Sequence, residues 1–481
     1  TGNDVTGIYL SGDNTKLIKN GVINISGTGM GISYTPTVEL SNINDTTGTT
    51  IASTSKQYQL PDMPTLVNRG EININVGGNF NYDGIRVIIS IDPSLNTPRT
   101  NSSSQIGFGG VIPEKVEIAP DFATGIATDR YTFENILKGA TGKGEYISQS
   151  LTWDATIVGS DLIMTRKSYT DFTDGLWFED FGKSLNEKYA VTNGEGRKIF
   201  DKLNYITNET DFRHIMGSMA GNIYANINQR ENDIARTLEN SLFSLQDSTN
   251  NTKENVKMNI IGGKGKNKEE TDGVVGYDYT TTGVVALREV ERTYKNTFGY
   301  SLGYLHTGFE FKDGNDSEEW VDTIQLGLHN KYKSNGWQLR NDLMGRVSLH
   351  NIDRNIDWES PLKRSELNGT YETYSITSEN VLGKEIELGK RASIMPYGGF
   401  RAMYITRPSF QEDGLERLEV EGNDAWSVKP RLGIELKGAL PLGRNSAWQL
   451  KGTLDFAYEY ELSDLNEREK AKLIAVEDGY H

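Results

Sequence analysis

The chain has 481 residues, a net charge of -16 and no cysteine. The absence of thiols excludes disulfides and thiolate metal sites, and it suits a chain that passes through an oxidising compartment. Lysines and arginines are scattered without a continuous basic stripe, which argues against nucleic acid as a partner. The mean hydropathy is -0.54, and no apolar run approaches the length of a membrane-spanning helix.

The first part of the chain is rich in Gly, Asn, Thr, Ser and Ile, which predicts β-structure with many turns. Residues 20–25 (NGVINI) and 68–74 (NRGEINI) resemble each other. An Asn/Gly turn followed by an Ile-x-Ile strand is what each rung of a parallel β-helix requires, because the turn tolerates a left-handed backbone and the Ile side chains stack inward. An ordinary β-sandwich with Asn-Gly turns is the alternative. The proline-containing segment 92–130 predicts irregular loop.

Strands are expected again at residues 146–158 and 162–165, where Trp153 is a candidate buried anchor. Between 179 and 247 the period of the apolar residues changes from two to 3.6, which predicts helices. A first, short apolar stripe runs from Ile199 to Ile206. A second stripe starts at Phe212 and continues to Leu245, so we expect one long helix there. Its middle is crowded with small residues, which fits either close packing in a soluble bundle or a slim helix inside a narrow barrel.

From residue 256 to 460 the chain repeats segments of about ten residues in which every second residue is apolar or aromatic. Alternate side chains of a strand point to opposite faces, so one face meets lipid and the other meets water. A sandwich strand also alternates, but here the polar face carries charged residues in strand after strand. The pattern therefore predicts a membrane barrel, with nine strands up to Tyr460 and a tenth that begins near Ala471.

Three sets of residues follow from these periods. The expected lipid-facing residues are Tyr300, Leu302, Leu326, Trp426, Leu432, Leu454, Phe456 and Tyr458. The expected lumen residues are Arg340, Asp342, Arg346, Arg401, Lys429, Arg431, Glu435, Lys451 and Asp455. Such charges form a solvated, mutually neutralising wall, or they bind the helix and keep a translocating chain hydrated. The expected pore-helix residues are Met216, Gly217, Met219, Gly221, Tyr224 and Ala225, of which Gly217, Gly221 and Ala225 share one narrow side.

Other motifs predict no catalytic chemistry, no metal and no cofactor. The glycine-rich segments 27–31 and 262–266 lack the spacing and the strand-loop-helix setting of a phosphate loop. The five histidines show no metal-ligand spacing. No serine lies beside plausible His and Asp partners, and no Gly-x-Ser-x-Gly occurs.

A β-helix-like stalk, a junction, a helix rich in small residues and a barrel, in that order, resemble the classical monomeric autotransporters of Gram-negative bacteria. The resemblance is most specific at residues 198–225 (KIFDKLNYITNETDFRHIMGSMAGNIYA) and also covers 426–437, with its Pro-Arg-Leu-Gly-x-Glu core. It implies an all-β chain with a parallel β-helix-like passenger stalk, a helical linker and an antiparallel transmembrane β-barrel of twelve strands. The last strands are missing, so we expect a chain truncated at both ends.

The resemblance divides the chain into the end of a passenger (1–130), a junction that nucleates its folding (131–178), a helical linker with a pore-spanning helix (179–247) and the barrel (248–481). It implies outer-membrane lipid, the barrel assembly machinery and periplasmic chaperones as partners, and a passenger that acts as an adhesin-like stalk on a host or partner-cell surface. Two alternatives stay open. Residues 1–180 could belong to a β-helical polysaccharide-degrading enzyme, or the barrel could be a porin, although a porin has no need of the long helix.

Overall fold

The computed structural model forms two compact units. The N-terminal unit comprises Thr1–Gly175, Gly182–His214 and Trp358–Lys363, and the C-terminal unit comprises Leu176–Phe181, Ile215–Asp357 and Arg364–His481. The residues that the structure describes are 6–11, 16–19, 23–25, 30–35, 65–68, 72–74, 86–89, 115–134, 144–247, 253–268, 273–389, 391–441, 449–462 and 469–476.

Parallel strands dominate the N-terminal unit. The largest sheet has the order β10-β8-β7-β5-β2, with all neighbours parallel, and consists of β2 (Lys16–Lys19), β5 (Thr65–Asn68), β7 (Arg86–Ile89), β8 (Lys115–Ile118) and β10 (Glu145–Ser148). Two parallel pairs accompany it, formed by β1 (Thr6–Ser11) with β4 (Met30–Thr35) and by β3 (Ile23–Ile25) with β6 (Ile72–Ile74). The last pair joins the two Ile-x-Ile copies in register, Ile23 with Ile72 and Ile25 with Ile74. The two similar segments therefore lie side by side as parallel strands.

The chain then changes to antiparallel pairing. β9 (Arg130–Phe133), β11 (Trp153–Val158) and β12 (Asp161–Arg166) form a sheet in the order β11-β12-β9. The single strand predicted over 146–158 is wrong, because β10 and β11 belong to different sheets. The predicted loop over 92–130 is also wrong where β8 and the 3₁₀ helix η3 (Pro120–Ala123) lie. Val116 and Ile118 alternate along β8 and are both fully buried, and this burial outweighs the tendency of the nearby prolines to favour a loop. Residues 92–114 lie outside the described residues.

Short helices follow the antiparallel sheet, namely α1 (Thr170–Thr173), α2 (Glu179–Lys188), α3 (Glu195–Leu203) and α4 (Glu209–Met219). Within the N-terminal unit, the chain after α3 is bonded to the start of the sheet, because Leu151 N donates to Ile206 O at 2.8 Å. Trp153 is 1% exposed and donates from Nε1 to Asn204 Oδ1 at 2.9 Å. The candidate anchor Trp153 is thus buried between the antiparallel sheet and the segment that follows α3.

The long helix predicted over 212–245 is interrupted. α4 ends at Met219, Gly221 adopts a left-handed backbone with φ 84°, and a 3₁₀ turn, η4 (Asn222–Tyr224), precedes α5 (Ile227–Asp247). The expectation that Gly217, Gly221 and Ala225 form a slim side of one continuous helix is therefore wrong. Glycine is present at 221 because the turn needs a positive φ, which other residues adopt at a cost.

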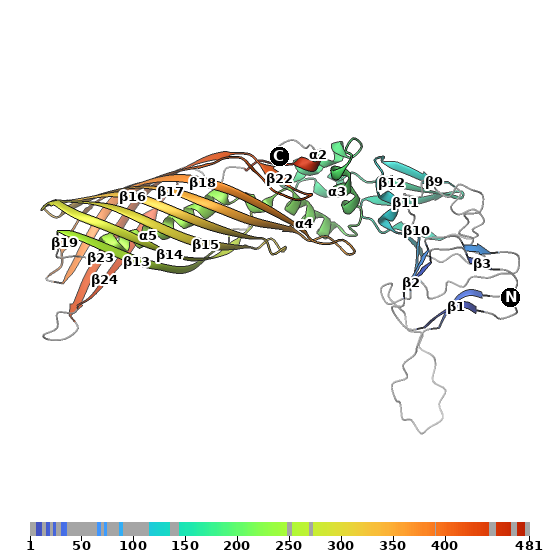
Figure 1. The fold of residues 1–481 in the computed structure, drawn as a ribbon, viewed down its shortest axis with the longest axis horizontal. Coiled ribbons are helices and arrows are strands. Elements are labelled where there is room, and N and C mark those ends of the chain that lie inside the picture. Colours follow the sequence, from blue (N-terminus) through green and yellow to red (C-terminus); the bar gives the residue numbers. More distant parts are fainter. Residues whose placement is uncertain are drawn as a thin grey trace, which may run out of the picture. The chain divides into compact units, whose positions relative to one another are not determined.

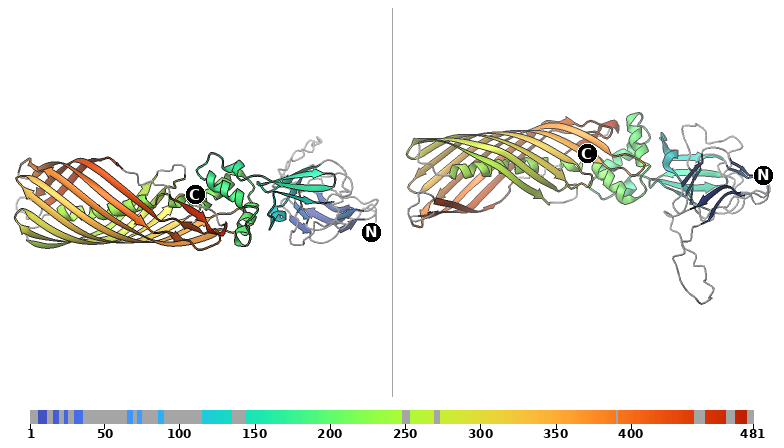
Figure 2. Two further views of the ribbon diagram at one scale, coloured as in Figure 1. Left: turned by 90° about the horizontal axis from the view of Figure 1, so that it is seen from above. Right: turned by 60° about the horizontal axis from the view of Figure 1, so that its bottom comes forward.

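Nine long antiparallel strands of the C-terminal unit curl around α5 (Figures 1 and 2). They are β13 (Glu254–Asn267), β14 (Tyr277–Thr293), β15 (Asn296–Phe311), β16 (Glu318–Ser334), β17 (Trp337–Ile356), β18 (Ser365–Lys384), β20 (Ala392–Arg407), β23 (Asn423–Pro441) and β24 (Gln449–Glu459), and β19 (Ile386–Glu387) pairs with β20. None of the helices in the described part of the chain has the length and apolarity needed to span a membrane.

A tenth strand of this sheet at Ala471 is not found. β25 (Ala471–Leu473) pairs instead with β22 (Leu418–Val420), which pairs with β21 (Phe410–Gln411), and these three form a small separate sheet. Another 3₁₀ turn, η5 (Ile474–Val476), follows β25. The apolar alternation at 471–473 therefore reports burial of Ala471 and Leu473 in the small sheet rather than an added wall strand.

Candidate functional site

Charged side chains are buried where α5 runs through the curled sheet. Arg230, Glu231 and Glu239 on the helix are all 0% exposed. Taking an ion out of water costs several kcal/mol unless it is paired and hydrogen-bonded. Each of these groups therefore requires a partner on the wall.

Glu239 is held by two arginines from different strands. Its carboxylate lies 2.6 Å from Arg346 Nη2 on β17 and 2.9 Å from Arg401 Nε on β20. Arg346 also donates to Gln325 and to Thr377, and Arg401 donates to α5 again through Asn232 Oδ1 at 3.1 Å. The donors of both guanidinium groups are thereby directed at the helix and its surrounding wall.

A second cluster surrounds Glu319 on β16. Arg230 Nε lies 2.6 Å from Glu319 Oε2, and neither side chain is exposed. His350 on β17 lies between two carboxylates, with Nδ1 3.0 Å from Glu319 and Nε2 3.0 Å from Glu231 on α5. Tyr371 stacks on the His350 ring at 4.2 Å and donates its hydroxyl to Glu319. This cluster joins the helix to three neighbouring strands.

The turn before α5 is held by a third buried pair. Arg354 on β17 binds Glu412 through two contacts of 2.7 and 2.6 Å. Arg354 also donates to the carbonyl oxygen of Ser218 at 2.7 Å, and Tyr224 donates to Glu412 at 2.5 Å. These contacts connect the end of α4 and η4 to the wall and to the segment that carries β21.

The C-terminal end of α5 is also bonded to the wall. Gln246 Nε2 donates to Asp342 Oδ1 at 2.7 Å, and Asp342 also contacts His329 at 2.8 Å. Lys437 Nζ lies 3.2 Å from Asp247 Oδ1. The helix is thus attached to the sheet along its whole length.

The predicted lumen residues other than Lys451 share the face of the sheet that contacts α5, but the structure brings only some of them together. Arg346 and Arg401 meet at Glu239, Arg340 and Arg431 both contact Glu379, and Arg431 also contacts Asp455 at 2.6 Å. The remaining members are paired locally, Asp342 with Arg340, Lys429 with Glu461, and Glu435 with Lys437. Lys451 belongs to β24, and its side chain lies outside the described residues.

The predicted pore-helix residues lie before α5 rather than in it. Met216, Gly217 and Met219 belong to α4, Gly221 forms the left-handed turn, Tyr224 belongs to η4, and Ala225 follows that turn. The apolar stripe by itself does not predict the charged residues of α5 that contact the wall. Their signal was present in the sequence: Glu231 and Glu239 occur within the apolar stripe of Ile234, Leu238 and Leu242.

The predicted lipid-facing residues lie on the outer face of the sheet and are exposed in the isolated chain. All eight expose 46% to 70% of their surface: Tyr300, Leu302, Leu326, Trp426, Leu432, Leu454, Phe456 and Tyr458. A continuous apolar exterior of this kind fits lipid rather than water. Within the described ranges no group of His, Cys, Asp and Glu has a metal-binding arrangement.

Comparison with known families gives two matches. Residues 256–480 match the autotransporter β-domain model, and residues 96–168 match the model of the BigA β-sandwich domain. The chain carries an autotransporter translocator domain. The match covers the wall strands from residue 256 onward. It confirms the translocator domain that the resemblance implied and the all-β barrel class predicted from the alternation.

Solved structures of translocator domains are among the matches. The translocator domain of the autotransporter NalP from Neisseria meningitidis is 15% identical, with a TM-score of 0.42, and covers 52% of this chain and 85% of its own. The β-domain of the Bordetella autotransporter BrkA is 15% identical, with a TM-score of 0.33, and covers 46% of this chain and 87% of its own. No curated protein matches the chain.

The translocator domain places the protein in the Gram-negative outer membrane, with its passenger exported to the cell surface. Domains of this family are generally not catalytic. The BigA match covers β8 to β12, which is part of the region where the sequence left a β-sandwich open as the alternative to a β-helix.

Proposed function

We propose that the translocator ends export with α5 locked in its lumen as a plug, and that the passenger acts as an adhesin-like stalk on the cell surface. The observation that carries the first part is the burial of Glu239 between Arg346 and Arg401. Removing α5 would leave both guanidinium groups without their carboxylate, at a cost of about 3–5 kcal/mol for one broken buried pair. The plugged state is therefore strongly favoured over an open porin.

The parallel ladder of the N-terminal unit supports the stalk. In a solenoid each rung buries its core against the next, so length is added without a new fold and the tip is held away from the membrane. The register of Ile23 with Ile72 and Ile25 with Ile74 has the regularity of such rungs. An adhesin-like partner at the tip belongs to this proposal.

The junction around Trp153 is proposed to fold first outside the cell and to template the parallel strands. Support comes from its buried aromatic cluster, in which the Trp153 and Phe122 rings lie 5.3 Å apart and Phe122 also contacts Phe133. β10 continues the parallel sheet and the chain then enters β11 of the antiparallel sheet, so the two sheets follow each other directly. A preformed antiparallel sheet offers a fixed start for rung addition.

Barrel assembly machinery and periplasmic chaperones are the proposed partners during assembly, with outer-membrane lipid afterwards. The support is the exterior of the sheet, where residues such as Leu302 and Leu432 expose 56% and 70% of their surface. An apolar surface of this kind aggregates in water unless it is covered until insertion.

The plug is tested by cross-linking, since the chain has no native cysteine. Ala235 on α5 forms one buried cluster with Met403, Ile405 and Ala425 of the wall. We expect the double variant Ala235→Cys with Ala425→Cys to form a disulfide in outer membranes after the passenger has reached the surface. The matched control pairs Ala235→Cys with Ala402→Cys, whose side chain points to the outer face of β20, and should stay reduced.

Conductance gives an independent readout. Deletion of 227–247 should raise single-channel conductance in planar bilayers, because the lumen loses its filling helix. Equal conductance of the deletion variant and the parent, together with failure of the lumen pair to cross-link, would show that α5 does not plug the barrel. Protease accessibility of the passenger on intact cells reports export separately.

A further inference from the structure

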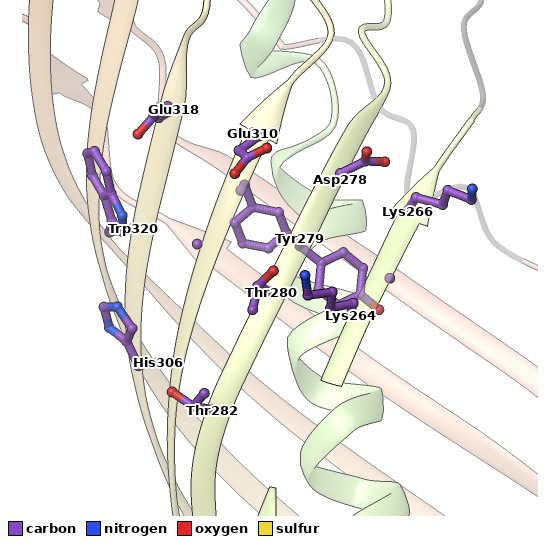
Figure 3. Close-up of a pocket in the computed structure, with 13 residues that line it drawn as sticks. Lys264, Lys266, Asp278, Tyr279, Thr280, Thr282, His306, Glu310, Glu318 and Trp320 are labelled. Carbon is purple, nitrogen blue, oxygen red and sulfur yellow. The ribbon is translucent and has the colours of Figure 1, made fainter. Parts of the chain in front are cut away.

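A hollow of about 670 Å³ lies on the outer face of the sheet, over β13 to β16 (Figure 3). Lys264 and Lys266 line it from β13, Thr280 from β14, Glu310 from β15, and Glu318 and Trp320 from β16. All six occupy the even-numbered, outward positions of their strands. The lumen network of α5 uses none of them.

The hollow exists because a glycine interrupts the row of outward side chains. Gly308 on β15 pairs with Thr280 on one side and with Trp320 on the other. A Cβ atom added to Gly308 would lie 3.6 Å from Trp320 Cδ1. The surface dips at the glycine, and the indole of Trp320 forms a wall beside the dip.

The hollow lies just beyond the apolar band of the exterior. Along β16 the outward residues are Leu328, Leu326 and Ile324, followed by Asp322, Trp320 and Glu318. Tryptophan is typical of the level where hydrocarbon meets head groups, because its ring is apolar and its N–H is polar. The hollow therefore faces a head-group layer. It lies at the end of the strands opposite to the C-terminus of α5. In the plugged state proposed above the passenger, which precedes α5 in the chain, is at the cell surface, so α5 enters the lumen from outside and this end of the strands is the external one.

Charges are arranged asymmetrically in the hollow. Lys264 and Lys266 are exposed, and within the described residues neither has an ion-pair partner, whereas Asp278 beside them is paired with Lys312 at 3.0 Å. Glu310 and Glu318 lie on the other side, near Trp320 (Figure 3). The site thus offers cations at one wall, carboxylate acceptors at the other and an aromatic ring among them.

We propose that this hollow binds the phosphorylated sugar head group of an outer-leaflet glycolipid. Lysine ammonium groups bind phosphate as point charges, so Lys264 and Lys266 receive a phosphate. The sugar ring lies against Trp320, and Glu310, Glu318 and Thr280 accept hydrogen bonds from its hydroxyl groups. Three strand spacings separate β13 from β16, about 14 Å, which matches a phosphorylated disaccharide and exceeds a phosphoethanolamine head group. The inference rests on the proposed direction of α5.

The test measures binding of a bisphosphorylated diglucosamine glycolipid to the full chain in detergent by native mass spectrometry. We expect the double variant Lys264→Ala with Lys266→Ala, and the variant Trp320→Ala, each to weaken binding at least tenfold. The matched control uses the same residue types at the other end of the exterior, where Lys384 lies 5.1 Å from the Trp337 ring. Trp337→Ala and Lys384→Ala should leave binding unchanged.

Other probes identify the ligand source. Removal of the phosphates from the glycolipid should weaken its binding to the parent. The loss should be about as large as the loss that the lysine double variant shows with the bisphosphorylated glycolipid. Equal binding by parent and hollow variants overturns the proposal. The proposal is also overturned if phosphatidylethanolamine, or the phosphorylated disaccharide without acyl chains, binds the parent as tightly as the bisphosphorylated glycolipid does and loses binding in the same Lys264 and Trp320 variants.

Assembly is checked first for every variant by heat-modifiable gel mobility and by passenger exposure on intact cells. Loss of these signals would report failure of the translocator, whereas unchanged signals with lost glycolipid binding report the hollow alone. If an alanine variant does not assemble, Lys264→Gln with Lys266→Gln takes its place, since glutamine keeps the polar stem and removes the charge.

Discussion

Arg401 on β20 and Glu239 on α5, 162 positions apart in the sequence, form a buried ion pair with contacts of 2.9 and 3.1 Å. Neither side chain exposes more than 1% of its surface. Arg346 binds the same carboxylate from β17. One acidic residue of the helix therefore fixes two strands of the wall.

Replacement of Glu239 should weaken the plugged barrel. Glu239→Ala leaves Arg346 and Arg401 buried without their carboxylate, and we expect a loss of about 3–5 kcal/mol in unfolding free energy. Asn240→Ala, at the neighbouring exposed position, should change little. The measurement is the temperature at which each purified variant loses its fast-migrating folded form. Equal temperatures for the two variants would contradict the assigned role of Glu239.

The two glycines before α5 should respond differently to alanine. At Gly221 the φ of 84° is strained for alanine, and the added Cβ would lie 2.8 Å from Leu418 Cδ1; a cost of about 1–3 kcal/mol is expected. At Gly217, within α4, the nearest atom would be 3.5 Å away, on Trp177. Gly217→Ala should therefore be neutral or stabilise the helix by up to about 1 kcal/mol. Thermal loss of heat-modifiable mobility compares them, and the reverse order would exclude the turn as the reason for Gly221.

Truncation of Trp153 should destabilise the junction. Trp153→Ala empties a buried site and leaves Asn204 without its indole donor, which should cost about 3–5 kcal/mol. Trp153→Phe keeps the ring contact with Phe122 and loses mainly the hydrogen bond, at about 1 kcal/mol. The readout is protease resistance of the surface-exposed passenger, with barrel mobility as the internal control. A passenger equally resistant in all three proteins would refute the role of Trp153.

Depth in the membrane should decide the effect of a charge on the exterior. Leu326→Arg, in the apolar band of β16, should cost about 2–4 kcal/mol, whereas Asn351→Arg, beyond the band on β17, should cost about 0–1 kcal/mol. Both positions are exposed on the outer face. Yields of folded barrel in outer membranes measure the difference. Similar yields would mean that the lipid band is misplaced.

Acid should loosen the parallel ladder through Glu117. Burial by itself would raise the pKa of this carboxyl, but hydrogen bonds from Arg86 and Gln149 outweigh it and hold the pKa below its usual range. A lowered folded-state pKa contributes stability that is complete above the unfolded pKa of about 4.3 and is lost as pH falls through the folded value.

Hydrogen exchange of 86–89 and 115–118 in the full chain, corrected for the intrinsic rate, measures this loss below about pH 4.3. Glu117→Gln removes the titrating group and should flatten the pH dependence of these segments. An unchanged pH dependence in the variant would assign the acid effect to other groups.

The sequence by itself determined what depends on local period. Alternation assigns Leu302 and Ser301 to opposite faces of β15, because successive side chains of a strand must diverge, and the same rule located the exterior and the lumen face. The Ile-x-Ile spacing likewise predicted strands at 23–25 and 72–74, whereas their mutual pairing is visible only in the structure. The change in the period of the apolar residues from two to 3.6 located the helical segment at 179–247.

Only the tertiary structure decided which groups meet across the lumen. Arg346 and Arg401 both bind Glu239 because the curl of the sheet brings β17 and β20 to one side of α5. The alternation of side chains along each strand carries no information on how the sheet curls. The break at Gly221 and the pairing of β25 with β22 were decided in the same way. At the break, Arg354 binds the carbonyl oxygen of Ser218 and Glu412 accepts the Tyr224 hydroxyl, and such long-range contacts override local propensity.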